Sequence, residues 1–386
     1  MRKKATNAKD SAEEAYAYTP GLKVKRASVV RKTRRLPLPG EILVNEGNTV
    51  DFDTIVARTE IPGEPNVIKV DEILNVSPED VPAFMVKKVG DKVERDDVIA
   101  KYTPFFGLIK KFARSSMAGT IESISDSSGQ VVIRAPPIPV EIKAYVQGTV
   151  KETIPREGVI IETDAAFIQG IFGISGERHG KLMVVAGSPD DVLTEDKISP
   201  DQRGKILVGG SLVTHEALKR AADSGVAGIV IGGIEGGDLS QFLGYEMGVA
   251  ITGEEEIGFT LIITEGFGKM RMSDRTFQLL KEFDGYEAAI NGATQIRAGV
   301  LRPEIIIPHK SARRKAEERE FARGMVPGTP VRIIGDPYFG KIGTVMGLPV
   351  QLKKVETGSD VRVVDVKLEG GEVATVPRAN VEIIEE

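Results

Sequence analysis

The sequence contains no cysteine and no tryptophan, and other aromatic residues are few, with seven tyrosines and fourteen phenylalanines. The absence of cysteine excludes disulfide bonds, thiolate metal sites and cysteine nucleophiles, and it suits a reducing cytoplasm. No apolar run reaches the roughly 20 residues that a membrane helix needs, and no apolar core follows the basic N-terminus. We therefore expect a cytoplasmic protein with no membrane partner and no signal peptide.

The chain is rich in glycine and proline instead, with 42 and 21 of these residues among 386. Such a composition indicates many turns and therefore a β-rich structure. The apolar fraction of 41% and the charged fraction of 28% are those of an ordinary globular protein. The length predicts two to four domains.

Charge is distributed unevenly, since residues 1–40 carry a net charge of +8 and the remainder carries −13. A basic arm on an acidic body is typical of a segment that binds RNA or another polyanion, and a solubilising tail is the alternative. We expect residues 1–20 to be a disordered basic tail. The candidate nucleic-acid-binding residues are the seven cations that follow it: Lys23, Lys25, Arg26, Arg31, Lys32, Arg34 and Arg35.

Two internal repeats lie between residues 40 and 165. The stretch "EGNTVDFDTIVART" matches "VGDKVERDDVIAKY" 43 positions later, and "AGTIESISDSSGQVVI" matches "QGTVKETIPREGVIIE" 29 positions later. Short alternating strands between glycine turns, repeated in this way, predict a quasi-symmetric β-sandwich or barrel.

The stretch "VGDKVERDDVIAKY", followed by "MAGTIESI", resembles the barrel-sandwich hybrid fold of lipoyl and biotinyl domains, which also occurs in RNA polymerase large subunits. The resemblance implies such a domain over residues 21–160. A carrier domain would need a modified lysine at an exposed hairpin tip. Lys110 and Lys111 lie between apolar residues at too long a spacing, so we predict that they carry no prosthetic group and that the protein has no cofactor.

Residues 161–305 change to a strand–helix–strand pattern. Ile206–Val208, Gly228–Ile231 and Phe259–Ile263 are buried-strand patterns, and Thr214 and Ser273 are predicted helix caps. Units of this length predict a small α/β domain with a parallel sheet.

Glycine-rich loops are expected after these three strands. The carboxyl ends of parallel strands are common ligand sites, so a pocket for a small molecule is one interpretation and turns without a ligand are the other. Neither the Rossmann nor the P-loop spacing is present. The candidate ligand residues are Gly209, Gly210, Ser211, Gly232, Gly233, Gly266 and Gly268.

The stretch "GTPVRIIGDPYFGKIGTV", after a predicted linker helix over residues 306–323, resembles the KOW motif of NusG-family elongation factors and large-subunit ribosomal proteins. The resemblance implies an SH3-like barrel over residues 324–386 that contacts RNA or protein. Residues 328–386 carry a net charge of −2, which favours a protein partner. Pro337, Tyr338, Phe339 and Lys341 are the predicted contact residues, unless the aromatic rings cover the end of the barrel itself.

No catalytic or metal-binding pattern is present. His179, His215 and His309 have no partner at a useful spacing, and His215 is expected to be solvated in the first turn of a helix. The fold class is therefore multidomain and β-rich with an α/β middle. We expect a non-enzymatic protein associated with the transcription or translation machinery, with an RNA polymerase or ribosome component as partner. The alternatives are an enzyme or ligand-binding protein with its site on the glycine loops, and a scaffold subunit of a larger complex.

Overall fold

The computed structural model describes residues 22–103, 110–245, 255–294, 301–309, 325–333, 337–338, 341–349, 352–354, 360–368 and 371–383. It is β-rich, as the sequence predicts, with its strands distributed over several sheets. The predicted tail over residues 1–20 lies outside the described residues. So does the predicted linker helix, except residues 306–309. These residues are not helical, because 306–308 end the strand β22 (Glu304–Pro308) and His309 follows it. No helix among the described residues is long and apolar enough to cross a membrane.

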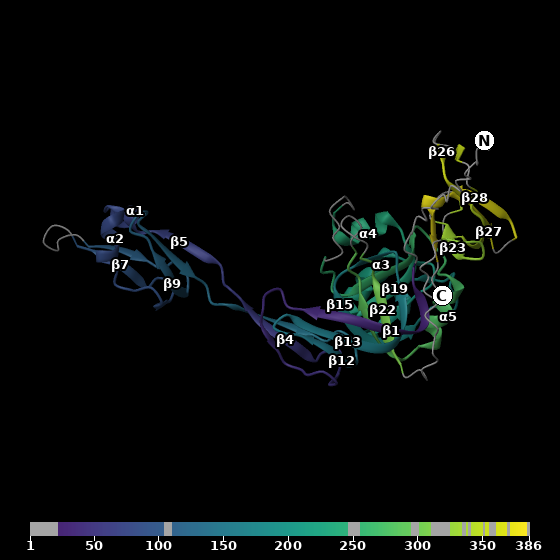
Figure 1. Ribbon diagram of the computed structural model, residues 1–386, viewed down its shortest axis with the longest axis horizontal. Coiled ribbons are helices and arrows are strands. Elements are labelled where there is room, and N and C mark those ends of the chain that lie inside the picture. Colours follow the sequence, from purple (N-terminus) through teal and green to yellow (C-terminus); the bar gives the residue numbers. More distant parts are fainter. Residues whose placement is uncertain are drawn as a thin grey trace, which may run out of the picture.

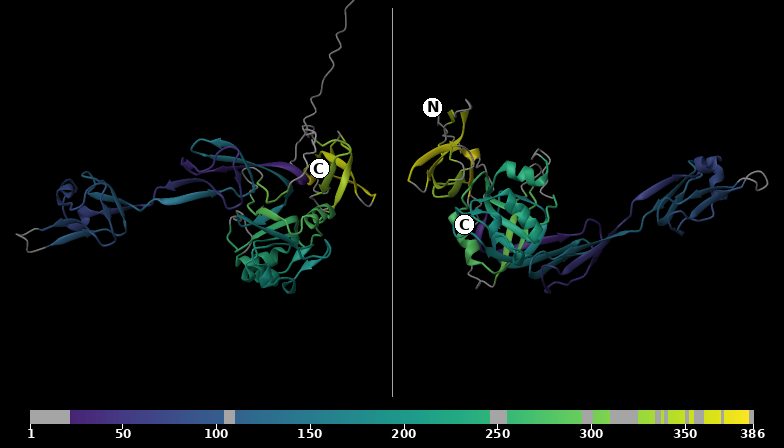
Figure 2. Two further views of the ribbon diagram at one scale, coloured as in Figure 1. Left: turned by 90° about the horizontal axis from the view of Figure 1, so that it is seen from below. Right: turned by 180° about the vertical axis from the view of Figure 1, so that it is seen from behind.

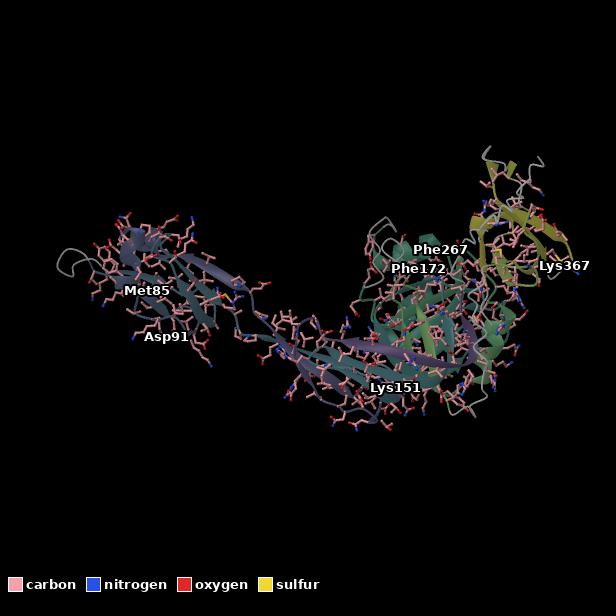
Figure 3. All side chains as sticks on the ribbon, in the orientation of Figure 1. Met85, Asp91, Lys151, Phe172, Phe267 and Lys367 are labelled. Carbon is pink, nitrogen blue, oxygen red and sulfur yellow. The ribbon has the colours of Figure 1, made fainter. Side chains whose placement is uncertain are left out.

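The molecule is elongated and consists of a body with a β-arm on one side and a small C-terminal sheet on the other (Figure 1). Met85 and Asp91 label the far end of the arm, whereas Phe172 and Phe267 label the body (Figure 3). The body is the α/β part of the chain.

An eleven-stranded sheet runs through the body and into the near part of the arm. Four of its strands run parallel to one another: β15 (Glu177–Val184), β17 (Ile206–Val208), β19 (Gly228–Ile234) and β20 (Thr260–Phe267). The predicted buried strands are thus confirmed. The sheet continues on its other side through β21 (Glu287–Asn291), β22, β13 (Gly158–Gln169), β12 (Gly148–Ile154) and β3 (Thr49–Val50).

Three helices cover the parallel strands, and they pack on both faces of the sheet (Figure 2). Thr214 and Ser273 cap α3 (His215–Ser224) and α5 (Asp274–Glu282) as predicted, each accepting a backbone N–H three residues on. α4 (Gly236–Leu243) was not expected, because its first residues are two glycines. The helices α3 and α4 pack on one face, and α5 packs on the other.

The near part of the arm is here called the outer copy, because its strands enclose the other copy in the order of the chain. It is built on β1 (Val24–Arg35), which pairs with β13 along almost its whole length. A second sheet is formed by β2 (Glu41–Ile42), β4 (Ile55–Ile61) and β11 (Ile138–Lys143). The core of the outer copy includes Ala289 and Ile306 of the body. The expected domain boundary between residues 160 and 161 falls inside β13.

The far part of the arm, here called the inner copy, is inserted between β4 and β11. Its core cluster contains only residues between Ile68 and Ile133. A four-stranded sheet is formed by β5 (Pro65–Lys69), β10 (Gln130–Arg134), β9 (Gly119–Ile124) and β6 (Lys92–Val93), and β7 (Val98–Tyr102) pairs with β8 (Lys111–Arg114). The short helices α1 (Val70–Leu74) and α2 (Val81–Phe84) complete it.

The two copies have equivalent strand pairings, at the offsets of the sequence repeats. β3–β12 corresponds to β6–β9, β12–β13 to β9–β10, and β4–β11 to β7–β8. Single hydrogen bonds also correspond, because Gly47 N donates to Val150 O at 2.8 Å and Gly90 N donates to Ile121 O at 2.8 Å. The repeat in the sequence is therefore a repeat in the structure, with the second copy nested inside the first.

The C-terminal sheet has five antiparallel strands in the order β28 (Val373–Pro377), β27 (Val363–Leu368), β24 (Ile342–Gly347), β23 (Pro330–Ile333) and β29 (Val381–Ile383). It encloses its own apolar core. Among the described residues, two ion pairs attach it to the rest of the molecule. Arg332 Nη2 lies 2.8 Å from Glu265 Oε2, and Arg302 Nη2 lies 2.7 Å from Glu382 Oε1.

Candidate functional site

The predicted basic arm is not a free segment in the described residues, because Val24–Arg35 forms the strand β1. Val24 and Val30 anchor the strand because they are buried. Its cations are divided between two environments: Arg26, Arg31 and Arg35 are exposed, whereas Lys25, Lys32 and Arg34 are half-buried. The seven candidate cations thus lie along or next to one strand.

Five of these cations form ion pairs with glutamates of the body and the outer copy. Arg34 makes two hydrogen bonds with Glu177, at 2.6 and 2.7 Å. Arg26 pairs with Glu282, and this contact holds the pKa of the Glu282 carboxyl below its usual value. The other pairs are Arg31–Glu162, Lys32–Glu304 and Arg35–Glu157. Much of the positive charge that suggested polyanion binding is therefore neutralised within the protein.

The candidate glycines lie at the carboxyl edge of the parallel strands, but their neighbours are the protein's own backbone. A Cβ on Gly232 would lie 2.2 Å from Met270 O, and one on Gly233 would lie 2.2 Å from Gly268 O. Gly210 similarly faces Asp191, whose carbonyl accepts a hydrogen bond from Ser211 N. These residues are glycines because two backbone segments approach closely there.

Three of the glycines were expected in loops and lie in strands instead. Gly232 and Gly233 belong to β19, and Gly266 belongs to β20. The strands run on because the segment around Met270 packs on them and donates hydrogen bonds to them, such as the one from Gly268 N to Ile234 O. Gly209 packs against Ile231 and Leu193.

The predicted contact loop of the C-terminal sheet is described at three residues. Pro337 and Lys341 are exposed, whereas Tyr338 is half-buried against the core of that sheet. The Tyr338 hydroxyl donates to Glu372 Oε1 at 3.1 Å, and this bond raises the pKa of the tyrosine. Phe339 lies outside the described residues. Tyr338 is thus partly a structural residue, as the alternative interpretation expected.

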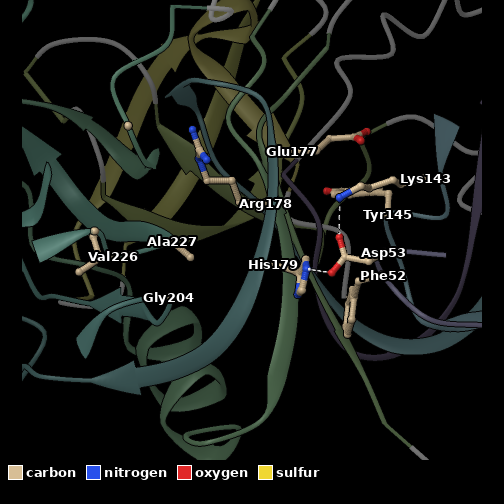
Figure 4. A pocket seen from close by; sticks show the side chains of 12 residues that line it. Phe52, Asp53, Lys143, Tyr145, Glu177, Arg178, His179, Gly204, Val226 and Ala227 are labelled. Carbon is tan, nitrogen blue, oxygen red and sulfur yellow. Dashed lines mark hydrogen bonds and ion pairs between the residues drawn. The ribbon is translucent and has the colours of Figure 1, made fainter. Parts of the chain in front are cut away.

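A cleft of about 400 Å³ lies where the outer copy meets the body, and its lining includes glycines at the amino ends of the parallel strands (Figure 4). Asp53 and Phe52 come from the turn between β3 and β4, Lys143 ends β11, and His179 lies on β15. The cleft therefore lies between the outer copy and the body, two parts of the chain that share one of the apolar cores.

Asp53 lies between Lys143 and His179 in this cleft, as Figure 4 shows. One of its oxygens is 2.7 Å from Lys143 Nζ and the other is 2.9 Å from His179 Nε2. The hydrogen bond that Asp53 accepts from Lys143, with the one that it accepts from His179, holds the pKa of Asp53 below its usual value. The imidazole also stacks on Phe52, with ring centres 4.8 Å apart and planes inclined by 4°. The ring of His179 is thus fixed in orientation by two contacts.

Tyr145 borders the same cleft in a strained backbone conformation, with φ of 70°. Residues other than glycine occupy this region at a cost of about 1–3 kcal/mol, and they are common at functional sites. Its buried hydroxyl donates to Glu304 Oε1 at 3.2 Å. Burial, together with the charge of Glu304, raises the pKa of Tyr145 well above its usual value.

The histidines differ from the sequence expectation. His179 has a carboxylate partner 126 residues away, and His309 Nε2 lies 2.8 Å from Arg26 O. His215 is not solvated, because it is only 6% exposed at the packed start of α3. No local sequence signal could have found the His179–Asp53 pair, since the fold alone brings these residues together.

The arrangement can orient a small polar molecule, because an imidazole fixed by a carboxylate borders a cleft with Lys143 and Arg178. Among the described residues, no cluster of three or more His, Asp or Glu side chains could hold a metal ion. Comparisons with protein families and with curated proteins found no match for this chain.

Proposed function

We propose that the protein is a non-enzymatic binding protein of the transcription or translation machinery, with an RNA polymerase or ribosome component as partner. The observation that carries this proposal is the inner copy, which has its own core and extends far from the body (Figure 1). A module that is held out in this way can reach a partner that the body does not touch. The resemblance of the C-terminal segment to KOW-type SH3-like barrels supports the choice of machinery.

Co-purification tests the proposal. The full chain, isolated from its natural cells at moderate salt, is expected to retain ribosomal proteins or polymerase subunits before and after RNase treatment. Loss of every such protein with RNase would reduce the association to a shared RNA. Retention of neither, with or without RNase, would contradict the proposal.

The contact loop of the C-terminal sheet is tested with two variants of Tyr338. Tyr338→Phe removes only the hydrogen bond to Glu372, whereas Tyr338→Ala also removes the ring that packs on the core. If the ring contacts the partner, Tyr338→Ala weakens retention by roughly tenfold or more while Tyr338→Phe does not. If Tyr338→Ala lowers the melting temperature and leaves retention unchanged, the ring is structural only.

A second candidate function is small-molecule binding in the cleft between the outer copy and the body. The specific observation in its favour is the stacked and hydrogen-bonded imidazole of His179. Native mass spectrometry of the protein from its natural source is expected to show a bound small molecule that His179→Ala loses. A mass equal to that of the polypeptide would count against this candidate.

A further inference from the structure

The outward face of the β7–β8 hairpin, at the end of the inner copy, carries three cations and one aromatic ring. Lys101 lies opposite Phe112 in the strand register, and Arg114 follows Phe112 by two residues, so these three side chains share one face. Ala100 and Ala113, which face the other way, are fully buried in the core of the inner copy. Lys110 precedes Phe112 by two residues and is exposed. We call Lys101, Lys110, Phe112 and Arg114 the hairpin face.

The outer copy offers a built-in comparison, because three residues of the hairpin face have equivalents there. Arg58 corresponds to Lys101, and its guanidinium lies 2.8 Å from Glu41 Oε2. Lys143 corresponds to Arg114 and forms its ion pair with Asp53. Glu141 corresponds to Phe112 and lies opposite Arg58 in the register. In the outer copy, then, each cation on this face has a carboxylate partner, and an acid stands where the inner copy has a ring.

The cations of the hairpin face are not neutralised in this way. Lys101, Lys110 and Arg114 make no ion pair with any residue that the structure describes. Arg114 Nη1 donates to the backbone oxygen of Asp96 at 2.7 Å, and its guanidinium carbon lies 5.9 Å from the centre of the Phe112 ring. The ring itself is 39% exposed.

The inner copy as a whole is not basic, so the positive charge of the hairpin face is not a general property of this part of the chain. Residues 62–137 contain ten Lys and Arg against eleven Asp and Glu. Two acids of the inner copy have cationic partners of their own, since Asp97 pairs with Lys87 and Glu72 pairs with Lys69. The neighbouring Lys111 is also engaged, because its ammonium group donates to Leu74 O at 2.8 Å. The charge of the hairpin face is therefore local.

We propose that the hairpin face binds single-stranded nucleic acid. Phosphates would contact the three cations, and one base would stack on Phe112, because an exposed ring beside unpaired cations is the combination that single strands require. A duplex keeps its bases stacked on one another and leaves none for the ring. The proposal deepens the proposed function by naming the chemistry of one partner, and its cellular setting rests on that function.

Fluorescence anisotropy of a labelled single-stranded RNA, titrated with the full chain at several salt concentrations, tests the proposal. Three phosphate contacts predict a slope of log K against log salt of about −2, since each contact on a single strand contributes about −0.7. Lys101→Ala combined with Arg114→Ala should reduce the slope to about −0.7. Phe112→Ala should weaken binding about tenfold with the slope unchanged, and Phe112→Tyr should restore it.

Arg58→Ala is the matched control, because it removes the equivalent cation from the outer copy and should leave RNA binding unchanged. Thermal unfolding of every variant should match that of the parent chain, because all the replaced side chains lie on the surface. Deletion of residues 1–21 separates the hairpin face from the basic tail. If that deletion abolishes binding while the hairpin variants do not, the proposal is overturned.

Other outcomes would also overturn it. One is the absence of RNA binding even at low salt, and another is equal affinity for a duplex of the same length. A third is binding of the protein to phosphatidylglycerol vesicles, dependent on Lys101 and Arg114, together with no binding of RNA. That result would show that the hairpin face binds a membrane surface. RNA binding by the purified chain without co-purifying machinery would support the hairpin face and contradict the proposed function. Co-purification of the machinery without RNA binding by the purified chain would contradict only the proposal for the hairpin face.

Discussion

The outer and inner copies have the same strand pairings but different surroundings. In the outer copy, β13 continues into the body sheet and the core includes Ala289 and Ile306. The inner copy contributes every residue of its own core. The comparison teaches that a repeated sequence pattern sets the local pairing, whereas the flanking chain decides whether the module is attached or independent.

Removal of the inner copy should have the largest effect on RNA binding of all the changes considered, and it should leave the stability of the body unchanged. Replacement of residues 62–137 by Asn-Gly would join β4 to β11 directly after the Ile61–Ile138 pair, with a turn that suits a two-residue hairpin. We expect complete loss of RNA binding in the anisotropy assay and an unchanged melting temperature of the body. Unfolding of the whole chain would show that the two copies are not independent.

The same kind of truncation in the two cores should destabilise different extents of the structure. Ile121→Ala in the inner copy and Ile161→Ala in the outer copy each replace a side chain that is at most 1% exposed. Each should cost about 2–5 kcal/mol of local stability. Hydrogen exchange should show faster exchange only between residues 65 and 134 for Ile121→Ala. For Ile161→Ala, β21 and β22 should also be affected, and confinement to the outer copy would contradict the shared core.

The smallest effect is expected from Asp53→Asn, because the ion pairs of Asp53 with Lys143 and His179 are largely exposed. Surface pairs contribute less than about 1 kcal/mol. The pKa of Asp53 is lowered in the folded protein, so its contribution is present above the unfolded value of about 3.9 and is lost as the pH falls through the folded value.

Urea unfolding of the parent chain between about pH 5 and pH 2 should therefore show a small loss of stability that Asp53→Asn lacks. Asp96→Asn in the inner copy is the matched control, because Asp96 occupies the equivalent position in the repeat. A loss of stability of the same size in the parent chain and in Asp53→Asn would contradict the role of the Asp53 ion pairs.

The repeat was visible in the sequence because it depends on local geometry. Gly47 and Gly90 both have positive φ, of 82° and 91°, and each precedes a buried valine at the same distance. Nesting was not visible, because β4 and β11 pair across the whole inner copy and short-range patterns carry no information about such partners. The α/β strands were predictable for the opposite reason, since capped helices separate them at short range.

Side-chain partners were the least predictable feature. The sequence gives no local sign that Arg34 would meet Glu177 or that Asp53 would meet His179, because strand pairing across the fold creates these contacts. A signal for the hairpin face did exist. Extension of the second repeat, with its offset of 29 residues, aligns Phe112 with Glu141. At this position the inner copy has an aromatic ring and the outer copy has an acid.

The connection between the copies has a mechanical consequence. Two adjacent segments join the inner copy to β4 and β11. Pro62, Pro136 and Pro137 interrupt the backbone hydrogen bonds between these segments, because proline has no N–H to donate. A force applied to the end of the inner copy acts in the same direction on both connecting segments. The hydrogen bonds between β4 and β11 therefore bear little shear. The tension passes along the covalent chain to the turn where Ala144 N donates to Thr54 O. Force applied by a bound partner would therefore be felt first beside Asp53 and Lys143, at the cleft between the arm and the body.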